Sequence, residues 1–194
     1  MPRRPTRTVP TVLLPGPIGD RPTDWPHWLA GELTAADRQV HWCRPADPDR
    51  PELAGWLEGL ADTLAGLPDD GFDVVAHSLG CLLWLHHAGA DAPRPARVAL
   101  VAPPAAGESP AEWRGFFPVP LSIDAVRRAA DGTVLVGGAD DPYCAGGVAQ
   151  VYGTRLKMAA TVLPEAGALT AETGYGPWPA VLDWCGRDNL AFLA

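Results

Sequence analysis

Residues 72–83 read Phe-Asp-Val-Val-Ala-His-Ser-Leu-Gly-Cys-Leu-Leu, and this stretch decides the fold. Phe72 to Val75 is a short apolar run with paired valines, which is typical of a buried strand. Small residues and a serine follow, and residues 81–85 then resume as an apolar run of helical character. The pattern predicts a strand, a sharp turn at Ser78 and a helix that starts directly after it.

The turn matches the pattern of a nucleophile elbow. Residues 76–80 occupy the place of the G-x-S-x-G pattern, in which the serine backbone is strained and its flanking residues must be small. Ala76 and Gly80 meet that requirement. Such a turn lifts the Ser78 hydroxyl out of the sheet and leaves the Leu79 N–H at a helix N-terminus, where it can stabilise an oxyanion. The alternative is a buried strand that simply enters a helix, with Ser78 as a cap.

Length, composition and charge restrict the class of protein. The 194 residues suffice for one domain with a substantial core, and an apolar share of 47% is ordinary for a soluble globular protein. The formal net charge of -8, without a basic stripe, argues against nucleic-acid binding. No stretch approaches the roughly 20 apolar residues that a membrane span needs. We expect a loose tail over residues 1–7 and a single domain over residues 8–194.

The cysteines and the motifs that are missing give further expectations. The four cysteines are far apart and form no C-x-x-C pair, and no signal peptide is recognisable, so we expect reduced thiols and a cytoplasmic protein. No His/Cys/Asp/Glu cluster has metal-ligand spacing, and neither a Walker loop nor a dinucleotide fingerprint is present. The sequence therefore predicts no metal and no cofactor, and a small molecule as the partner; it leaves the oligomeric state open.

Apolar runs alternate with helical patterns along the chain. We expect strands at residues 8–14, 39–43, 72–75, 97–101, 133–136 and 158–163, and helices at residues 24–33, 51–67, 81–90, 145–152 and 179–192. Continuous apolar strands predict a mostly parallel sheet with helices on both faces, which is a three-layer α/β sandwich. Ligands bind at the carboxyl ends of such strands. The loops after Leu14, Val136 and Leu163 should therefore meet Ser78 at one edge.

One of these loops carries an acid. Gly137-Gly138-Ala139-Asp140-Asp141-Pro142 follows a predicted strand, downstream of the serine. An acid at a strand end, in the chain order serine then acid, is typical of a hydrolase triad. Asp-Pro pairs also initiate turns, so the pattern alone would favour a simple turn.

Further stretches carry a resemblance to a known family, and they run in order along nearly the whole chain: Pro15-Gly16, His27-Trp28, residues 76–81, Phe117-Pro118-Val119-Pro120-Leu121, Asp141-Pro142-Tyr143-Cys144 and Gly174-Tyr175-Gly176-Pro177-Trp178-Pro179. The sequence resembles the compact serine hydrolases of the α/β-hydrolase superfamily, the branch of retinoblastoma-binding protein 9. The resemblance implies a small, lidless α/β-hydrolase fold that acts on ester, thioester or amide bonds. It implies Ser78 as the nucleophile and Asp141 as the acid.

The chain departs from that family at the third triad residue. The family histidine maps onto Ala168, which lies 27 residues after Asp141, and no histidine follows His87. Alanine can neither take the serine proton nor return it to a leaving group. Hydrolysis is therefore expected to be impaired or lost.

A second departure concerns the oxyanion hole. Leu79 should supply one N–H donor, and the superfamily usually takes the other from the residue after the turn glycine. That residue is Pro17, which has no N–H, although Ile18 could substitute if the loop is displaced. Loss of one donor costs about 3–4 kcal/mol. An engineered substitution at residue 168 would not explain Pro17, so the pair of departures favours natural divergence.

Several residues are candidates to replace the base or to line the pocket. His27 could be a relocated base but is better explained by packing beside Trp28, while the histidines at residues 41, 77, 86 and 87 are expected to be structural or too far away. Glu165 and Glu172 flank the vacant position but are weak bases. An apolar, possibly aromatic, substrate pocket is expected, lined by Pro17, His27, Trp28, Phe117 and Trp178.

Three hypotheses follow from the sequence. The first is a serine hydrolase with an incomplete triad. The second is a repurposed catalyst of the same fold, such as a cyclase or lyase, and the third is a non-catalytic binding protein. Covalent labelling of Ser78, turnover that survives Ser78→Ala, and binding without turnover distinguish them in that order.

Overall fold

The computed structural model describes residues 9–18, 20–44, 47, 50–68 and 71–187. Its centre is one six-stranded sheet in the order β2-β1-β3-β4-β5-β6, in which every strand pair is parallel. The strands are β1 (Thr11–Leu14), β2 (Val40–Trp42), β3 (Asp73–His77), β4 (Arg97–Val101), β5 (Gly132–Gly138) and β6 (Ala160–Leu163). The strand order reverses beside β1, because β2 lies on one side of it and all later strands lie on the other. Ligand sites of open α/β sheets form at such a switch point.

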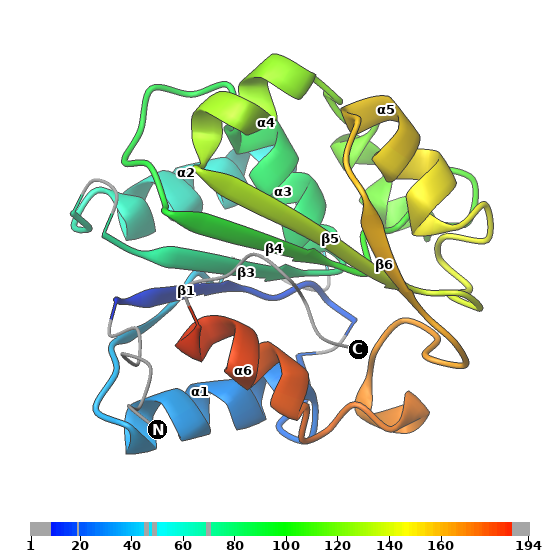
Figure 1. The fold of residues 1–194 in the computed structure, drawn as a ribbon. Helices are drawn as coiled ribbons and strands as arrows, with labels where there is room; N and C mark the ends of the chain where they lie inside the picture. Colours follow the sequence, from blue (N-terminus) through cyan, green and yellow to red (C-terminus); the bar gives the residue numbers. More distant parts are fainter. Residues whose placement is uncertain (1–8, 19, 45–46, 48–49, 69–70, 188–194) are drawn as a thin grey trace.

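Helices cover both faces of the sheet (Figure 1). One face carries α1 (Trp25–Ala35) and α6 (Pro179–Gly186), and the other carries α2 (Leu53–Leu64), α3 (Leu79–His87), α4 (Ile123–Ala129) and α5 (Thr154–Leu156). This is the expected three-layer sandwich, and the prediction of a parallel sheet covered on both faces is confirmed.

Two hydrophobic clusters fill the space between the layers. Val74 and Ala76 of β3 belong to the cluster under α2 and α3, whereas Val75 belongs to the cluster over α1 and α6. This alternation follows from the period of two along a strand, with both faces buried. Buried tryptophans complete each cluster, Trp56 and Trp84 on the α2/α3 side and Trp25 and Trp184 on the α1/α6 side.

Some predicted elements differ from the observed ones. The helix expected at residues 145–152 is a π-helical turn at Ala149–Gly153 that continues into α5, and α4 and the 3-10 helices Ala111–Phe116 and Ala171–Thr173 were not expected. The first strand begins at Thr11 rather than residue 8, and the last at Ala160 rather than residue 158. Residues 1–7 and the end of the predicted closing helix lie outside the described residues.

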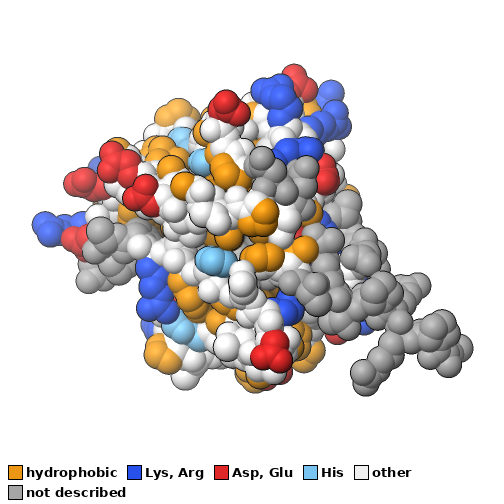
Figure 2. All heavy atoms as spheres, turned by 90° about the vertical axis from the view of Figure 1, so that its left-hand side faces the viewer, with side chains coloured by type: hydrophobic (Ala, Val, Ile, Leu, Met, Phe, Trp, Pro, Cys, Tyr) orange, Lys and Arg blue, Asp and Glu red, His pale blue; other side chains and the backbone are white. Residues whose placement is uncertain are grey.

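The surface has mixed charge. Figure 2 shows the side of the molecule where the strands begin, and acidic and basic side chains stand next to one another there without a continuous basic stripe among the coloured residues. In the described part of the chain, no helix combines the length and the apolar character needed to span a membrane.

Candidate active site

Ser78 lies on a strained turn between β3 and α3. The φ of 53° and ψ of -124° at Ser78 are unfavourable for a residue with a side chain. Ser78 is also buried, with 3% of its surface exposed. The turn is held on both sides, because the Ser78 N–H donates to the Val101 carbonyl at 2.9 Å and the Cys81 N–H donates to the Ser78 carbonyl at 2.9 Å. A Cβ on Gly80 would lie 2.1 Å from the Leu14 carbonyl oxygen, so only glycine fits there.

The loop after β1 passes directly over this turn. A Cβ added to Gly16 would come within 2.7 Å of the Leu79 backbone nitrogen and 3.0 Å of the Ser78 Cβ. Leu79 is the first residue of α3, so its N–H has no acceptor within the helix. Pro17 and Ile18 follow Gly16 and border a pocket beside the turn. Gly16 thus lies against Leu79, and Ile18, the other predicted oxyanion residue, lines the pocket two positions further on.

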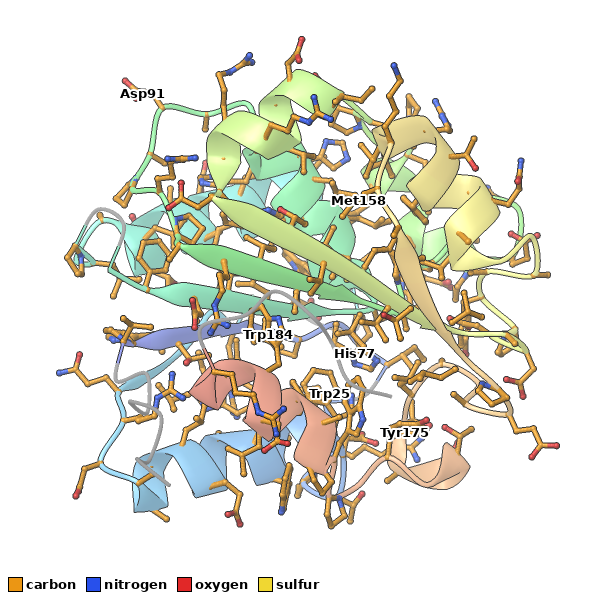
Figure 3. All side chains as sticks on the ribbon, in the orientation of Figure 1. Trp25, His77, Asp91, Met158, Tyr175 and Trp184 are labelled. Carbon is orange, nitrogen blue, oxygen red and sulfur yellow. The ribbon has the colours of Figure 1, made fainter. Side chains whose placement is uncertain are left out.

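The loop after β6 is hydrogen-bonded to the end of β3 and to the loop after β5. The His77 Nε2–H donates to the Ala168 carbonyl at 2.9 Å, and the Gly167 N–H donates to the Asp140 carboxylate at 2.8 Å. Figure 3 shows His77 on the α1/α6 side of the sheet with Trp25, whose ring it meets edge-on at 5.3 Å between centroids. The residue before Ser78 and the residue before Asp141 thus hold the segment that contains Ala168.

Asp141 is buried at the carboxyl end of β5. It is 3% exposed, and its Oδ1 accepts the Tyr143 N–H at 2.9 Å. Burial raises the pKa of this carboxyl to about 6, the neighbouring Asp140 acts in the same direction, and the Tyr143 N–H opposes them.

The nearby thiols are poor substitutes for the serine nucleophile. Burial raises the pKa of Cys144 to about 12, and it raises the pKa of Cys81 well above its ordinary value. A thiol attacks as the thiolate, so both cysteines remain unreactive near neutral pH.

A pocket of about 230 Å³ opens beside Ala168. Its apolar wall comes from the loop after β1 and from Pro142 and Tyr143, and its polar wall includes Asp24 and Glu172. Arg21 also lines it and forms an ion pair with Glu172. The pocket thus combines an apolar wall that includes an aromatic ring with an acidic side, which the N-terminus of α1 and the 3-10 helix 171–173 supply. Sequence reasoning missed Asp24, which only the fold brings to this edge.

Of the five residues expected to line the pocket, Pro17 does so and four lie elsewhere. His27 bonds through Nε2 to the Asp20 carboxylate at 2.9 Å, and Trp28 packs on the α1/α6 cluster beside it. Trp178 is buried against Trp25 with ring centroids 5.2 Å apart, and Phe117 packs on the α2/α3 cluster. Trp178 is thus a buried residue, whereas His27, Trp28 and Phe117 are half-buried.

The histidines of the chain lie outside the pocket beside Ala168. All five histidines belong to the described residues, and none lines the pocket beside Ala168. His86 Nε2 donates to the Phe116 carbonyl at 2.8 Å, while desolvation lowers the pKa of the buried His77 to about 4, too low for an effective base near neutral pH. Glu165, whose φ is 51°, is exposed and does not line the pocket beside Ala168. Glu172 lines that pocket but forms an ion pair with Arg21.

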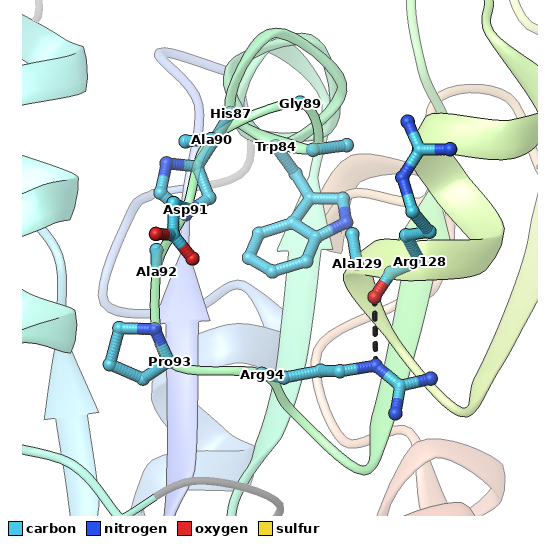
Figure 4. A pocket seen from close by; sticks show the side chains of 11 residues that line it. Trp84, His87, Gly89, Ala90, Asp91, Ala92, Pro93, Arg94, Arg128 and Ala129 are labelled. Carbon is cyan, nitrogen blue, oxygen red and sulfur yellow. Dashed lines mark hydrogen bonds between the residues drawn. The ribbon is translucent and has the colours of Figure 1, made fainter.

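A larger hollow of about 320 Å³ lies at the opposite end of the molecule (Figure 4). It is bordered by Trp84 and His87 of α3 and by Arg94, whose Nε–H donates to the Arg128 carbonyl at 2.8 Å. Arg94 precedes β4, so this hollow is at the amino end of the strands. The strained serine is at the carboxyl end, where parallel sheets place their chemistry.

The all-parallel sheet, its switch point and the strained serine turn define an α/β hydrolase. A family model described as "Serine hydrolase" matches residues 11–186, and the chain belongs to this family. Comparison with curated proteins gives no match.

Solved structures support the same fold. The ydeN gene product from B. subtilis is 20% identical with a TM-score of 0.74, over 91% of this chain and 96% of that one. A putative ydeN-like hydrolase from Pectobacterium atrosepticum is 24% identical with a TM-score of 0.64, over 89% and 86%. A pyrethroid hydrolase from Sphingobium faniae is 14% identical with a TM-score of 0.58, over 91% and 97%. At these identities the likeness concerns the fold.

Proposed function

We propose that this chain is a serine hydrolase in which Ser78 is the nucleophile, Asp141 the acid and Ala168 the vacated position of the base. The bonds that it would cleave are ester, thioester or amide bonds. The turn at Ser78 acts as a nucleophile elbow. Leu79 supplies the oxyanion N–H, with Ile18 as a second donor. The narrower kinship with the retinoblastoma-binding protein 9 branch is part of the same proposal.

The observation that best supports Ala168 as the vacated position is the way in which its loop is held. Its loop is hydrogen-bonded to the residue before the proposed nucleophile and to the residue before the proposed acid. A base in a triad must reach both of those groups, and these two hydrogen bonds tie the loop of residue 168 to the chain neighbour of each. Its small side chain leaves the pocket open there.

The proposal predicts a specific chemical defect. Ser78 retains its strained turn and its neighbouring N–H, but no histidine among the described residues lines the pocket to take its proton during attack. In a serine protease, loss of the triad base lowers turnover on the order of a million-fold. Binding and the oxyanion hole supply whatever catalysis remains.

Fluorophosphonate labelling, read by intact mass, tests this assignment. Ala168→His should form an adduct at least a hundredfold faster than the unmodified chain, and the double variant with Ser78→Ala should form none. Rapid labelling of the unmodified chain would show that another group activates Ser78. Absence of labelling in both proteins would reject the hydrolase proposal, in favour of a repurposed catalyst or a binding protein.

A further inference from the structure

The pocket beside Ala168 has room where a base is missing. It is bordered by Pro142 and Tyr143, which directly follow the buried Asp141, and by the loop that passes over Ser78. The lining residues thus come from the two loops that adjoin the proposed acid and the proposed nucleophile, and Ser78 and Asp141 themselves lie buried behind them. The described residues provide no imidazole at this place.

The charge of the pocket favours a basic occupant. Asp24 lines it and is 2% exposed, and its two carboxylate oxygens accept the Arg21 N–H at 2.9 Å and the Ala171 N–H at 2.7 Å. Glu172 is a second carboxylate on the wall, and the one cation among the described lining residues, Arg21, is paired with it. Acidic walls attract a group that becomes positively charged.

From these observations we infer that the pocket receives a nitrogen base carried by the substrate itself, an imidazole or a heterocycle of similar size and basicity, and that this group completes the site. The inference rests on the proposed function and narrows its substrate class. Substrates would be esters, thioesters or amides that bear such a ring near the scissile carbonyl.

The reaction balances without any further reagent. The ring nitrogen takes the Ser78 Oγ proton as Oγ attacks the carbonyl, and Asp141 stabilises the protonated ring. The ring then returns that proton to the leaving group as the carbon–heteroatom bond breaks, which leaves an acyl-serine. Water hydrolyses the acyl-serine, with the same ring taking and returning the proton.

Added imidazole probes the pocket directly. Fluorophosphonate labelling of the unmodified chain should accelerate at least tenfold with imidazole and saturate, whereas pyrazole, a ring of the same size and far lower basicity, should have little effect. Ala168→Leu fills the space and should abolish the acceleration. Asp141→Asn keeps the shape and should reduce it at least tenfold, which covers the case in which the leucine variant does not fold. Equal acceleration in Ala168→Leu, or none in the unmodified chain, would overturn the inference.

Matched substrates test the same idea by turnover. A nitrophenyl ester whose acyl group carries an imidazole should have a kcat/KM at least tenfold above that of its phenyl counterpart, and the difference should vanish in Ser78→Ala. If neither substrate nor imidazole shows the effect while Ala168→His labels, the proposed function stands and this inference fails. If Ala168→His does not label either, the proposed function itself fails.

Discussion

At the scale of single residues, two helical glycines should respond to alanine in opposite ways. A Cβ at Gly80 would lie 2.1 Å from a main-chain oxygen of β1, which cannot move without displacing the strand. Gly80→Ala should therefore lower the free energy of unfolding by about 3 kcal/mol or prevent folding. Gly59, in α2, has open space around it, and Gly59→Ala should raise that free energy by about 0.5–1 kcal/mol. Urea unfolding measures both, and equal effects would show that the close approach at the elbow is absent.

Single residues also show which features of the site the local sequence can predict. Ser78 and Gly80 were predictable because a local turn imposes their spacing and size. The hydrogen bonds of His77 to residue 168 and of Asp140 to residue 167 were not, because they join positions 91 and 27 residues apart. Local patterns carry no information about such pairs. Sequence reasoning therefore proposed Ala168 only through a family resemblance, whereas the structure supplies contacts that support it.

At the scale of elements, a buried arginine joins α6 to the start of the sheet. Arg97 and Asp73 are paired residues at the beginnings of β4 and β3, and their side chains form an ion pair at 2.5 Å. The Arg97 guanidinium also donates to the Trp184 carbonyl at 3.0 Å. Its Cζ lies over the indole ring of Trp184, 4.3 Å from the ring centroid. Arg97→Met would leave a buried carboxylate without its guanidinium. We expect a loss of about 3–5 kcal/mol of unfolding free energy.

Arg50→Met is the matched control for this prediction. Arg50 and Asp47 form an exposed ion pair at 3.1 Å, with side-chain exposures of 85% and 44%. Such pairs contribute about 0–1 kcal/mol, so urea midpoints should change little. A similar loss in both variants would contradict the role given to Arg97.

Element prediction succeeded where one residue pattern dominates. The strand predicted at residues 97–101 matches β4, a short run with two valines that is buried along its whole length. The helix predicted at residues 145–152 was shifted, because Gly146 and Gly147 lie in a turn and helical structure becomes established only after them. Gly147 has a φ of 76°, which ends any helix that would start earlier.

For the whole molecule, the three layers and the parallel strands were predictable from the alternation of strands and helices, but the strand order and the wall of the pocket were not. Of the tryptophans expected around the site, Trp178 is buried in the α1/α6 cluster and Trp28 packs half-buried against it. The acidic side of the pocket arises where α1 meets the segment after β6, and the hydrogen bond from the Ala171 N–H to Asp24 spans 147 positions. Only the packing of the layers brings these segments together.

The stability of the whole molecule should contain two opposing pH terms. Burial lowers the pKa of His77 to about 4, so its contribution to stability is present above the ordinary histidine value and is lost as pH falls from about 6.5 to 4. Burial raises the pKa of Asp141 to about 6, so its contribution is present at pH 4 and is lost as pH rises to about 6. Within this window the two terms oppose each other, and each is on the order of 3 kcal/mol.

Single substitutions should separate these terms in urea unfolding measured from pH 4 to pH 7. As pH falls, the unmodified chain should lose stability relative to His77→Gln, because glutamine does not have to be kept neutral. Over the same range it should gain stability relative to Asp141→Asn, because the variant has no carboxylate to protonate. The other carboxylates titrate in all three proteins, so their contributions cancel when one unfolding free energy is subtracted from another at the same pH. Parallel curves for the three proteins would show that neither group is buried as described, and would remove Asp141 from the position that the proposed mechanism gives it.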